Sequence, residues 1–141
     1  MSIYFVIRGK PISKARPRFK RYGKTYDPQE AEKKAWQWEV NQQLQEQGLF
    51  TGFLKLIPGP IILKVTFIMP TPKNTSKKII KELEDEKMMW HDKRPDLDNM
   101  IKWVKDCLNE FLWEDDSQVC VIHAMKVYGL KGKTEIEIEE L

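Results

Sequence analysis

The alternation of apolar and polar residues predicts four β-strands spread over the whole chain. Residues 3–8 form a short β-branched and aromatic run, and residues 118–128 form a longer one. Residues 61–69 are rich in β-branched residues and contain no turn residue, which indicates a strand buried on both faces near the centre of a sheet. In residues 134–139 glutamates alternate with threonine and isoleucine, which is typical of a strand with one solvent-exposed face.

A first helix is predicted between the first two strands. Asp27 is expected at the N-cap, Pro28 at the first helical position and Glu30 three residues after the cap. We expect this helix to run to about Gln47 and to end at Gly48. Its core-facing residues are predicted to be Ala31, Ala35 and Trp38, with Trp36, Val40 and Leu44 beside them.

Two further helices are predicted in the second half of the chain. Residues 73–87 are dense in both signs of charge, so we expect a solvated, partly mobile helix there. From Asp96 onward, apolar residues recur every three or four positions, which predicts an amphipathic helix. Its apolar stripe consists of Leu97, Ile101, Val104, Leu108 and Phe111. The same spacing places Asp98, Lys102, Lys105 and Asn109 on a neighbouring polar face.

The order of these elements predicts an α+β fold. It runs strand, basic loop, helix, strand, charged helix, aspartate-led helix and two strands, which favours a mixed sheet of about four strands with helices packed mainly on one side. The chain has 141 residues, of which 41% are hydrophobic and 32% charged. This size and composition indicate one folded domain over residues 1–141.

Several functional classes are disfavoured by the sequence. No apolar stretch approaches the ~18 residues of a membrane span, and the first residues lack the apolar run of a secretion signal, so we expect a cytoplasmic protein. The chain has no glycine-rich loop that would bind a nucleotide cofactor. Cys107 and Cys120 are interpreted as reduced packing residues, and His91 and His123 as packing or surface residues.

The positive charge of the chain is concentrated near its start. Residues 1–26 contain eight basic residues and no acidic ones, so the rest of the chain is net acidic. We call the part of this stretch that follows the first strand, up to Tyr26, the basic arm. In it, cations alternate with Phe19 and Tyr22, as on surfaces that bind phosphates and stack bases, although an ordinary basic surface loop remains the alternative. The candidate DNA-binding residues are Lys14, Arg16, Arg18, Lys20 and Arg21.

Acidic residues in two places suggest a metal site. Asp96 and Asp98 are two residues apart, so an extended chain before the helix would place both carboxylates on one side, near the positive end of the helix dipole. Asp116 precedes the strand that begins at Gln118, and we expect it to return to this pair as the third ligand of a Mg²⁺ ion. Asp115 is its adjacent competitor.

Each of these residues also has a structural interpretation. Asp96 and Asp98 could be an N-cap with a favourable dipole partner, and the Asp115-Asp116 pair could belong to a turn. Lys102 lies four residues after Asp98, so it could form an ordinary surface ion pair or contact the scissile phosphate.

Four separate segments resemble the RusA family of Holliday junction resolvases. The most specific one is Arg94-Pro95-Asp96-Leu97-Asp98-Asn99-Met100-Ile101-Lys102. The others are Asp106-Cys107-Leu108-Asn109, Trp113-Glu114-Asp115-Asp116-Ser117-Gln118-Val119, and the opening Gly9-Lys10-Pro11 with Ser13-Lys14-Ala15-Arg16-Pro17-Arg18. One departure follows Asn109, where many members have glycine and this chain has Glu110-Phe111-Leu112. We therefore expect the helix to end differently here.

The resemblance implies a homodimer that binds four-way junctions and makes paired symmetric nicks with Mg²⁺, with Mn²⁺ able to substitute. The metal-binding acids of that family correspond to Asp96, Asp98 and Asp116, and its functional lysine to Lys102. Asn99 and Asp115 are possible supporting residues. A prophage origin and a role in DNA recombination and repair are further implications. Two alternatives stay open, namely a nuclease for flaps or other branched DNA and a catalytically inactive DNA-binding module.

Overall fold

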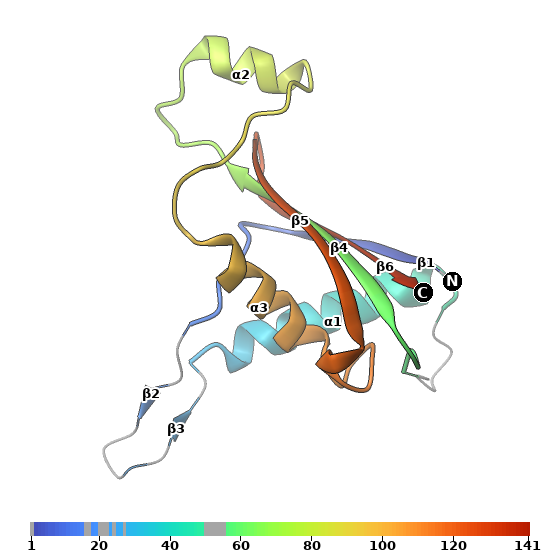
Figure 1. The fold of residues 1–141 in the computed structure, drawn as a ribbon. Helices are drawn as coiled ribbons and strands as arrows, with labels where there is room; N and C mark the ends of the chain where they lie inside the picture. Colours follow the sequence, from blue (N-terminus) through green and yellow to red (C-terminus); the bar gives the residue numbers. More distant parts are fainter. Residues whose placement is uncertain (1, 16–17, 20–22, 24, 27, 50–55) are drawn as a thin grey trace.

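A four-stranded mixed sheet forms the centre of the protein. The computed structural model describes residues 2–15, 18–19, 23, 25–26, 28–49 and 56–141. The strands lie in the order β1 (Ser2–Arg8), β6 (Lys133–Glu140), β4 (Ile61–Pro70) and β5 (Val119–Gly129) (Figure 1). β6 pairs antiparallel with β1 and β4, whereas β5 pairs parallel with β4. The predicted α+β fold with a mixed sheet is confirmed.

The two longer helices cover one face of this sheet. α1 (Glu30–Glu46) packs against β1, and α3 (Leu97–Leu108) packs against β5 and α1. Strand β6 buries Thr134, Ile136 and Ile138, as its alternation predicted. Strand β4 has the predicted central position, but its burial on both faces was wrong, because Lys64, Thr66 and Ile68 on the second face are only half-buried.

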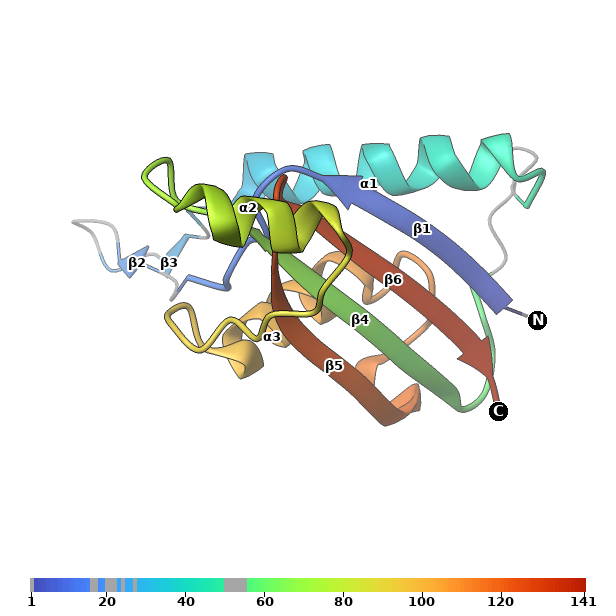
Figure 2. The same ribbon diagram turned by 90° about the horizontal axis from the view of Figure 1, so that it is seen from above.

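The second face of the sheet carries the smaller helix α2 (Lys77–Glu84) near one end (Figure 2). None of its residues is buried, which confirms the predicted solvated helix, and Ser76 caps its start by accepting a hydrogen bond from the Ile79 N–H. Leu83, with Thr66 and Ile68 of β4, lines a hollow on this face. The described helices include none that is long and apolar enough to cross a membrane.

Helix α1 begins later than the sequence predicted, and a different side of it faces the core. Gln29 occupies the N-cap position without a side-chain capping bond, and Asp27 lies outside the described residues. The buried residues are Trp36, Val40 and Leu44, whereas Trp38 is 62% exposed and Ala31 and Ala35 are exposed too. The larger side chains at positions 36, 40 and 44 form the apolar stripe of the helix. Trp36 packs edge to face against Trp103 of α3, with the two ring centroids 6.2 Å apart.

Helix α3 shows a smaller shift of its buried face. Val104 and Leu108 are buried as predicted, but Leu97, Ile101 and Phe111 lie at the margin of the core. The centre of the face is formed by Met100, Trp103 and Cys107. The reason is that α3 packs against both the sheet and α1, which turns Trp103 into the middle of the contact.

The second cysteine, Cys120, is exposed, so the interpretation of it as a packing residue was wrong.

The end of α3 is made without glycine. The helix ends at Leu108, Asn109 is the C-cap, and Glu110 adopts a left-handed backbone with a φ of 62°. The Glu110 N–H then donates to the carbonyl of Trp113 at 2.8 Å, which closes the turn. Glutamate therefore occupies a conformation that costs an L-residue about 1 kcal/mol or more and costs glycine almost nothing.

The basic arm contains a short hairpin where the sequence predicted a loop. β2 (Arg18–Phe19) pairs antiparallel with β3 (Thr25–Tyr26). The hairpin projects from the body of the protein beyond the start of α1 (Figure 1).

The strain at Glu110 gives a stability prediction. Glu110→Gly should raise the free energy of unfolding by about 1 kcal/mol, since glycine adopts the positive φ without a Cβ clash. Urea denaturation followed by circular dichroism measures the change. Glu110→Ala is the matched control and should leave stability nearly unchanged, because it keeps the Cβ. Equal gains for both variants would contradict the backbone argument.

Candidate active site

The start of α3 presents two exposed aspartates. Asp96 is the N-cap residue with extended backbone, and Asp98 lies in the first helical turn. The Asp96 side chain makes no capping hydrogen bond, so the interpretation as an N-cap alone does not account for its carboxylate. Both residues are exposed, and the positive end of the helix dipole stabilises their negative charge. This pair is available to a ligand.

The segment before Asp96 is fixed to the sheet by Lys126 of β5. Its Nζ donates to the carbonyls of Lys93 and Pro95. The backbone of the same strand accepts a hydrogen bond from the His91 N–H at 3.0 Å, and Trp90 forms a bridge with Val127. Asp96 is therefore held beside the second half of β5.

An open hollow of about 570 Å³ lies beside Asp96. It is lined by Arg94, Pro95, Asp96 and Asn99. The Asn99 carbonyl accepts a hydrogen bond from the Lys14 N–H at 3.0 Å, so the basic arm leaves the body of the protein next to the hollow. Asn99 thus has a structural part in joining the arm to α3.

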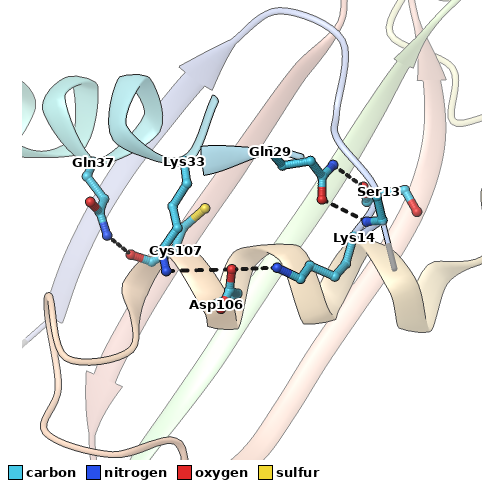
Figure 3. Close-up of polar contacts among 8 residues, drawn as sticks. Ser13, Lys14, Gln29, Lys33, Gln37, Asp106 and Cys107 are labelled. Atoms are coloured by element: carbon cyan, nitrogen blue, oxygen red, sulfur yellow. Dashed lines mark hydrogen bonds and ion pairs between the residues drawn. The ribbon is translucent and has the colours of Figure 1, made fainter. Parts of the chain in front are cut away.

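The base of the arm is anchored by polar side chains (Figure 3). Lys14 Nζ donates to Asp106 Oδ2 of α3 at 2.9 Å, and Lys33 Nζ of α1 lies 3.7 Å from the same oxygen. The buried Gln29 side chain donates to the Ser13 carbonyl and accepts from the Ala15 N–H. The Lys14 ammonium is therefore engaged by a carboxylate of its own chain, and its contact with DNA remains a prediction.

The other predicted DNA-binding residues of the arm are less fully placed. Arg16, Lys20 and Arg21 lie outside the described residues, and of Arg18 only the backbone, in β2, is described. Their contacts with DNA also remain predictions.

Lys102 forms the ion pair that its spacing allows. Its Nζ lies 3.9 Å from Asp98 Oδ2, and the two side chains are 65% and 72% exposed. Such an exposed pair contributes only a few tenths of a kcal/mol to stability, so it does little to hold either group away from a ligand. A role of Lys102 at a phosphate remains a prediction.

The two aspartates of the acidic turn before β5 make different contacts. Asp115 caps the short 3₁₀ helix η1 (Asp116–Gln118), because its Oδ2 accepts from the Ser117 N–H and its own N–H donates to Gln118 Oε1. The hydrogen bonds from Ser117 lower the pKa of Asp115 below its ordinary value. Asp115 is thus committed to the turn.

Asp116 is half-buried and held by one hydrogen bond. The Trp113 indole Nε1 donates to Asp116 Oδ1 at 3.0 Å. The turn itself is tied to the segment before β4, since the Gln118 amide donates to the carbonyls of Ile57 and Gly59. Asp116 is therefore positioned by contacts of its own turn.

The expected convergence of three aspartates does not occur within one chain. Asp98 lies at the start of α3, whereas Asp116 lies beyond its end (Figure 1). Leu108 follows Asp98 by ten residues, so the helix separates these two positions by about 15 Å. Across the described ranges, no three histidine, cysteine, aspartate or glutamate residues come together closely enough to hold a metal ion. A three-aspartate metal site therefore does not fit a single chain.

Two residues near the pair were missed by sequence reasoning. Lys126 positions the segment before Asp96, and Asp106 anchors the arm. A lysine within a strand that is otherwise mainly apolar was a signal for the first of them. Asp106 begins one of the segments that resemble the family, but neither its spacing nor that resemblance assigned it a role.

Comparison with known proteins gives a consistent result. The profile of the family described as endodeoxyribonuclease RusA matches residues 8–139. The YqaN protein of Bacillus subtilis strain 168 is 32% identical over 141 residues, which cover 99% of this chain and 96% of that protein. A crossover junction endodeoxyribonuclease RusA of Lactococcus phage r1t is 42% identical over 53 residues, which cover 37% of this chain and 40% of the phage protein.

The match to the family profile extends over nearly the whole chain, from the end of β1 through the aspartate pair and the acidic turn into β6. The protein belongs to the RusA endodeoxyribonuclease family.

Proposed function

We propose that the protein is a structure-selective, metal-dependent endodeoxyribonuclease that resolves four-way DNA junctions by paired symmetric nicks, in recombination and repair in the cytoplasm. The observation that carries this proposal is the exposed pair Asp96 and Asp98 at the start of α3, where Asp96 lines an open hollow beside the root of a basic arm. Membership of a family of endodeoxyribonucleases supports the nuclease chemistry. The junction is the substrate named for the phage relative.

Asp96 and Asp98 are proposed as ligands of Mg²⁺, which Mn²⁺ would replace, and Asp116 as a third ligand that only a second copy of the chain in the expected homodimer could bring to them. Carboxylate oxygens are the ligands that Mg²⁺ prefers, and the bound ion would neutralise phosphate charge and lower the pKa of a water molecule. Lys102 is proposed to contact the scissile phosphate, since its ammonium lies near Asp98 and is largely exposed. Asp115 supports the site indirectly by capping η1.

The arm is proposed to hold the DNA backbone next to the acids. Its root is fixed to α3 and α1 by Lys14 and Gln29, and its hairpin extends outward from there (Figures 1 and 3). Its excess of positive charge in the sequence would attract phosphates in a salt-dependent manner. Arg16, Arg18, Lys20 and Arg21 are the residues proposed for this contact.

The substrate class can be tested directly. With Mg²⁺, a labelled four-way junction should be nicked in two strands at symmetric positions, whereas plain duplex should stay intact. Nicking should disappear when the metal is chelated and return with Mn²⁺. Equal cleavage of a flap would favour the nuclease for other branched DNA. A shift of the junction's mobility with no nick at any metal concentration would identify a catalytically inactive binder.

The aspartate pair yields a mutational prediction. Asp98→Asn should abolish nicking, because the amide cannot supply an anionic ligand, while junction affinity stays the same or rises. Electrophoretic mobility shift and nicking of the same labelled junction measure the two effects separately. Asp85→Asn, at the exposed end of α2, is the matched control and should nick normally. Unchanged cleavage by the Asp98 variant would remove this residue from the catalytic assignment.

A further inference from the structure

We infer that a hollow on the second face of the sheet binds an unpaired segment of DNA. The bases lie on an apolar floor with Trp90 at its border, and the phosphates contact a rim of cations. The inference rests on the proposed function for DNA as the ligand. It goes beyond that function by assigning a second contact surface, which recognises unpaired bases and not the scissile phosphate.

The hollow lies where α2 and the segment after it approach the second face of the sheet (Figure 2). Its volume is about 600 Å³, and we call it the second-face hollow. Its floor includes Ile68 of β4 and Val127 of β5, with Met125, Leu130 and Met88 beside them. The last three are 38%, 45% and 62% exposed, although each is a large apolar side chain. Apolar side chains that gather in this way at the surface mark a contact with a ligand.

Trp90 is an exposed ring on a fixed backbone at the border of this hollow. Its two chain neighbours form backbone hydrogen bonds with Tyr128 and Lys126 of β5, at 2.9 and 3.0 Å. These bonds flank a bridge between Trp90 and Val127, so the two side chains lie next to each other on the second face. The Trp90 side chain is nevertheless 63% exposed. A ring held in this way is preorganised to stack on another ring.

The rim of the second-face hollow is positively charged. Against the one acid Glu86, it carries the four basic residues Arg8, Lys87, Lys131 and Lys133. Lys133 Nζ lies 3.2 Å from Glu135 Oε1. Within the described part of the chain, the other three basic side chains form no ion pair. Their charges are therefore available to phosphates.

An unpaired DNA strand matches both parts of the second-face hollow. Its phosphates complement the rim, and its bases expose faces that stack on aromatic side chains. In a duplex these faces are stacked on one another, so Trp90 and the apolar floor would gain no contact with them. At the branch point of a junction this stacking is interrupted, and the bases there are the easiest to unpair.

The hollow is also within reach of the candidate active site. Six residues separate Trp90 from Asp96, which limits the distance between their Cα atoms to about 20 Å. The segment between them contains Lys93 and Arg94 and a single acid, Asp92, so it has an excess of positive charge. A DNA strand bound at the acids can therefore follow a basic border to Trp90.

Two other occupants match the hollow less well. A second copy of the chain would place the same surface against itself about a two-fold axis. The cations of the two rims would then face each other, which opposes association. An acidic peptide would complement the rim as DNA does. DNA is favoured because the hollow adjoins a candidate site for DNA cleavage and belongs to a member of an endodeoxyribonuclease family.

Binding of a labelled oligothymidylate of about ten nucleotides, without metal, tests the surface directly. Trp90→Ala should raise the Kd measured by fluorescence anisotropy about tenfold, because the contact of one stacked base is lost. Trp38→Ala is the matched control. Trp38 is 62% exposed, but it shares a hollow on α1 with Glu39 and Glu46, so its removal should leave the Kd unchanged. An unchanged Kd for the Trp90 variant would overturn the inference.

The emission of Trp90 reports the stacking itself. The structure describes all five tryptophans, and Trp36, Trp103 and Trp113 are buried, so a Trp38→Phe protein retains Trp90 as its exposed indole. Unlabelled oligothymidylate should quench the emission of this protein. The quenching should disappear when Trp90→Phe is added. Emission that stays constant at saturating DNA would contradict stacking on Trp90.

A lysine pair tests the rim independently of Trp90. Lys87→Gln with Lys131→Gln should weaken oligothymidylate binding and reduce the slope of log Kd against log salt concentration by about one, since phosphate contacts are lost. Lys34→Gln with Lys73→Gln removes two exposed lysines that do not line the hollow, and it should change the slope less. Equal slopes for the two double variants would overturn the assignment of the rim.

The inference and the proposed function can fail separately. A wild type that nicks the junction, but binds no oligothymidylate or binds it equally well without Trp90, overturns the inference alone. A wild type that cuts no branched DNA, yet binds oligothymidylate through Trp90, overturns the proposed function alone. Loss of a dimer by Trp90→Ala in light scattering would assign the surface to a second copy of the chain. Weaker binding of an Asp-Leu peptide by Trp90→Ala, with oligothymidylate binding unchanged, would assign it to a protein partner, and either result overturns the inference.

Discussion

The parallel pairing of β5 with β4 is the constraint on which the rest of the structure depends. Two parallel neighbours need a long crossover, because the chain must return to the end of the sheet where the first strand began. Here α2, α3 and η1 form that crossover, and α3 supplies the return across the helix-covered face. Asp96 and Asp98 at the start of α3 and Asp116 after its end therefore lie at opposite ends of this crossover.

The strands were predictable because their signal is local. Alternation in β6 and the β-branched run of β4 are properties of a few neighbouring residues, and they predicted both elements and the central place of β4. The buried faces of the helices were less predictable. The choice between Trp36 and Trp38, or between Trp103 and Ile101, depends on the element that packs opposite, which periodicity does not contain. The end of α3 was not predictable from residue type either, since Glu110 adopts a backbone conformation that glycine favours.

The placement of the candidate site's residues was predictable to a similar extent. Residue types and spacing predicted exposed carboxylates at the start of α3 and the choice of Asp116 over Asp115, and the capping role of Asp115 supports that choice. The prediction that Asp116 lies next to Asp96 was wrong within one chain, because spacing along the sequence does not specify the direction of the crossover. The anchoring by Lys126 and Asp106 comes from long-range contacts that have no local signature.

The attachment of the arm to α3 gives the helix a second use. Asp106, which holds Lys14, and Asp98 are on the same helix, eight residues or about 12 Å apart. A helix of this length does not bend easily. It therefore fixes the distance between the root of the arm and the two exposed carboxylates. Under the proposed function, a nucleic acid would have to reach both points at once, and one with a different backbone path would contact only the root of the arm.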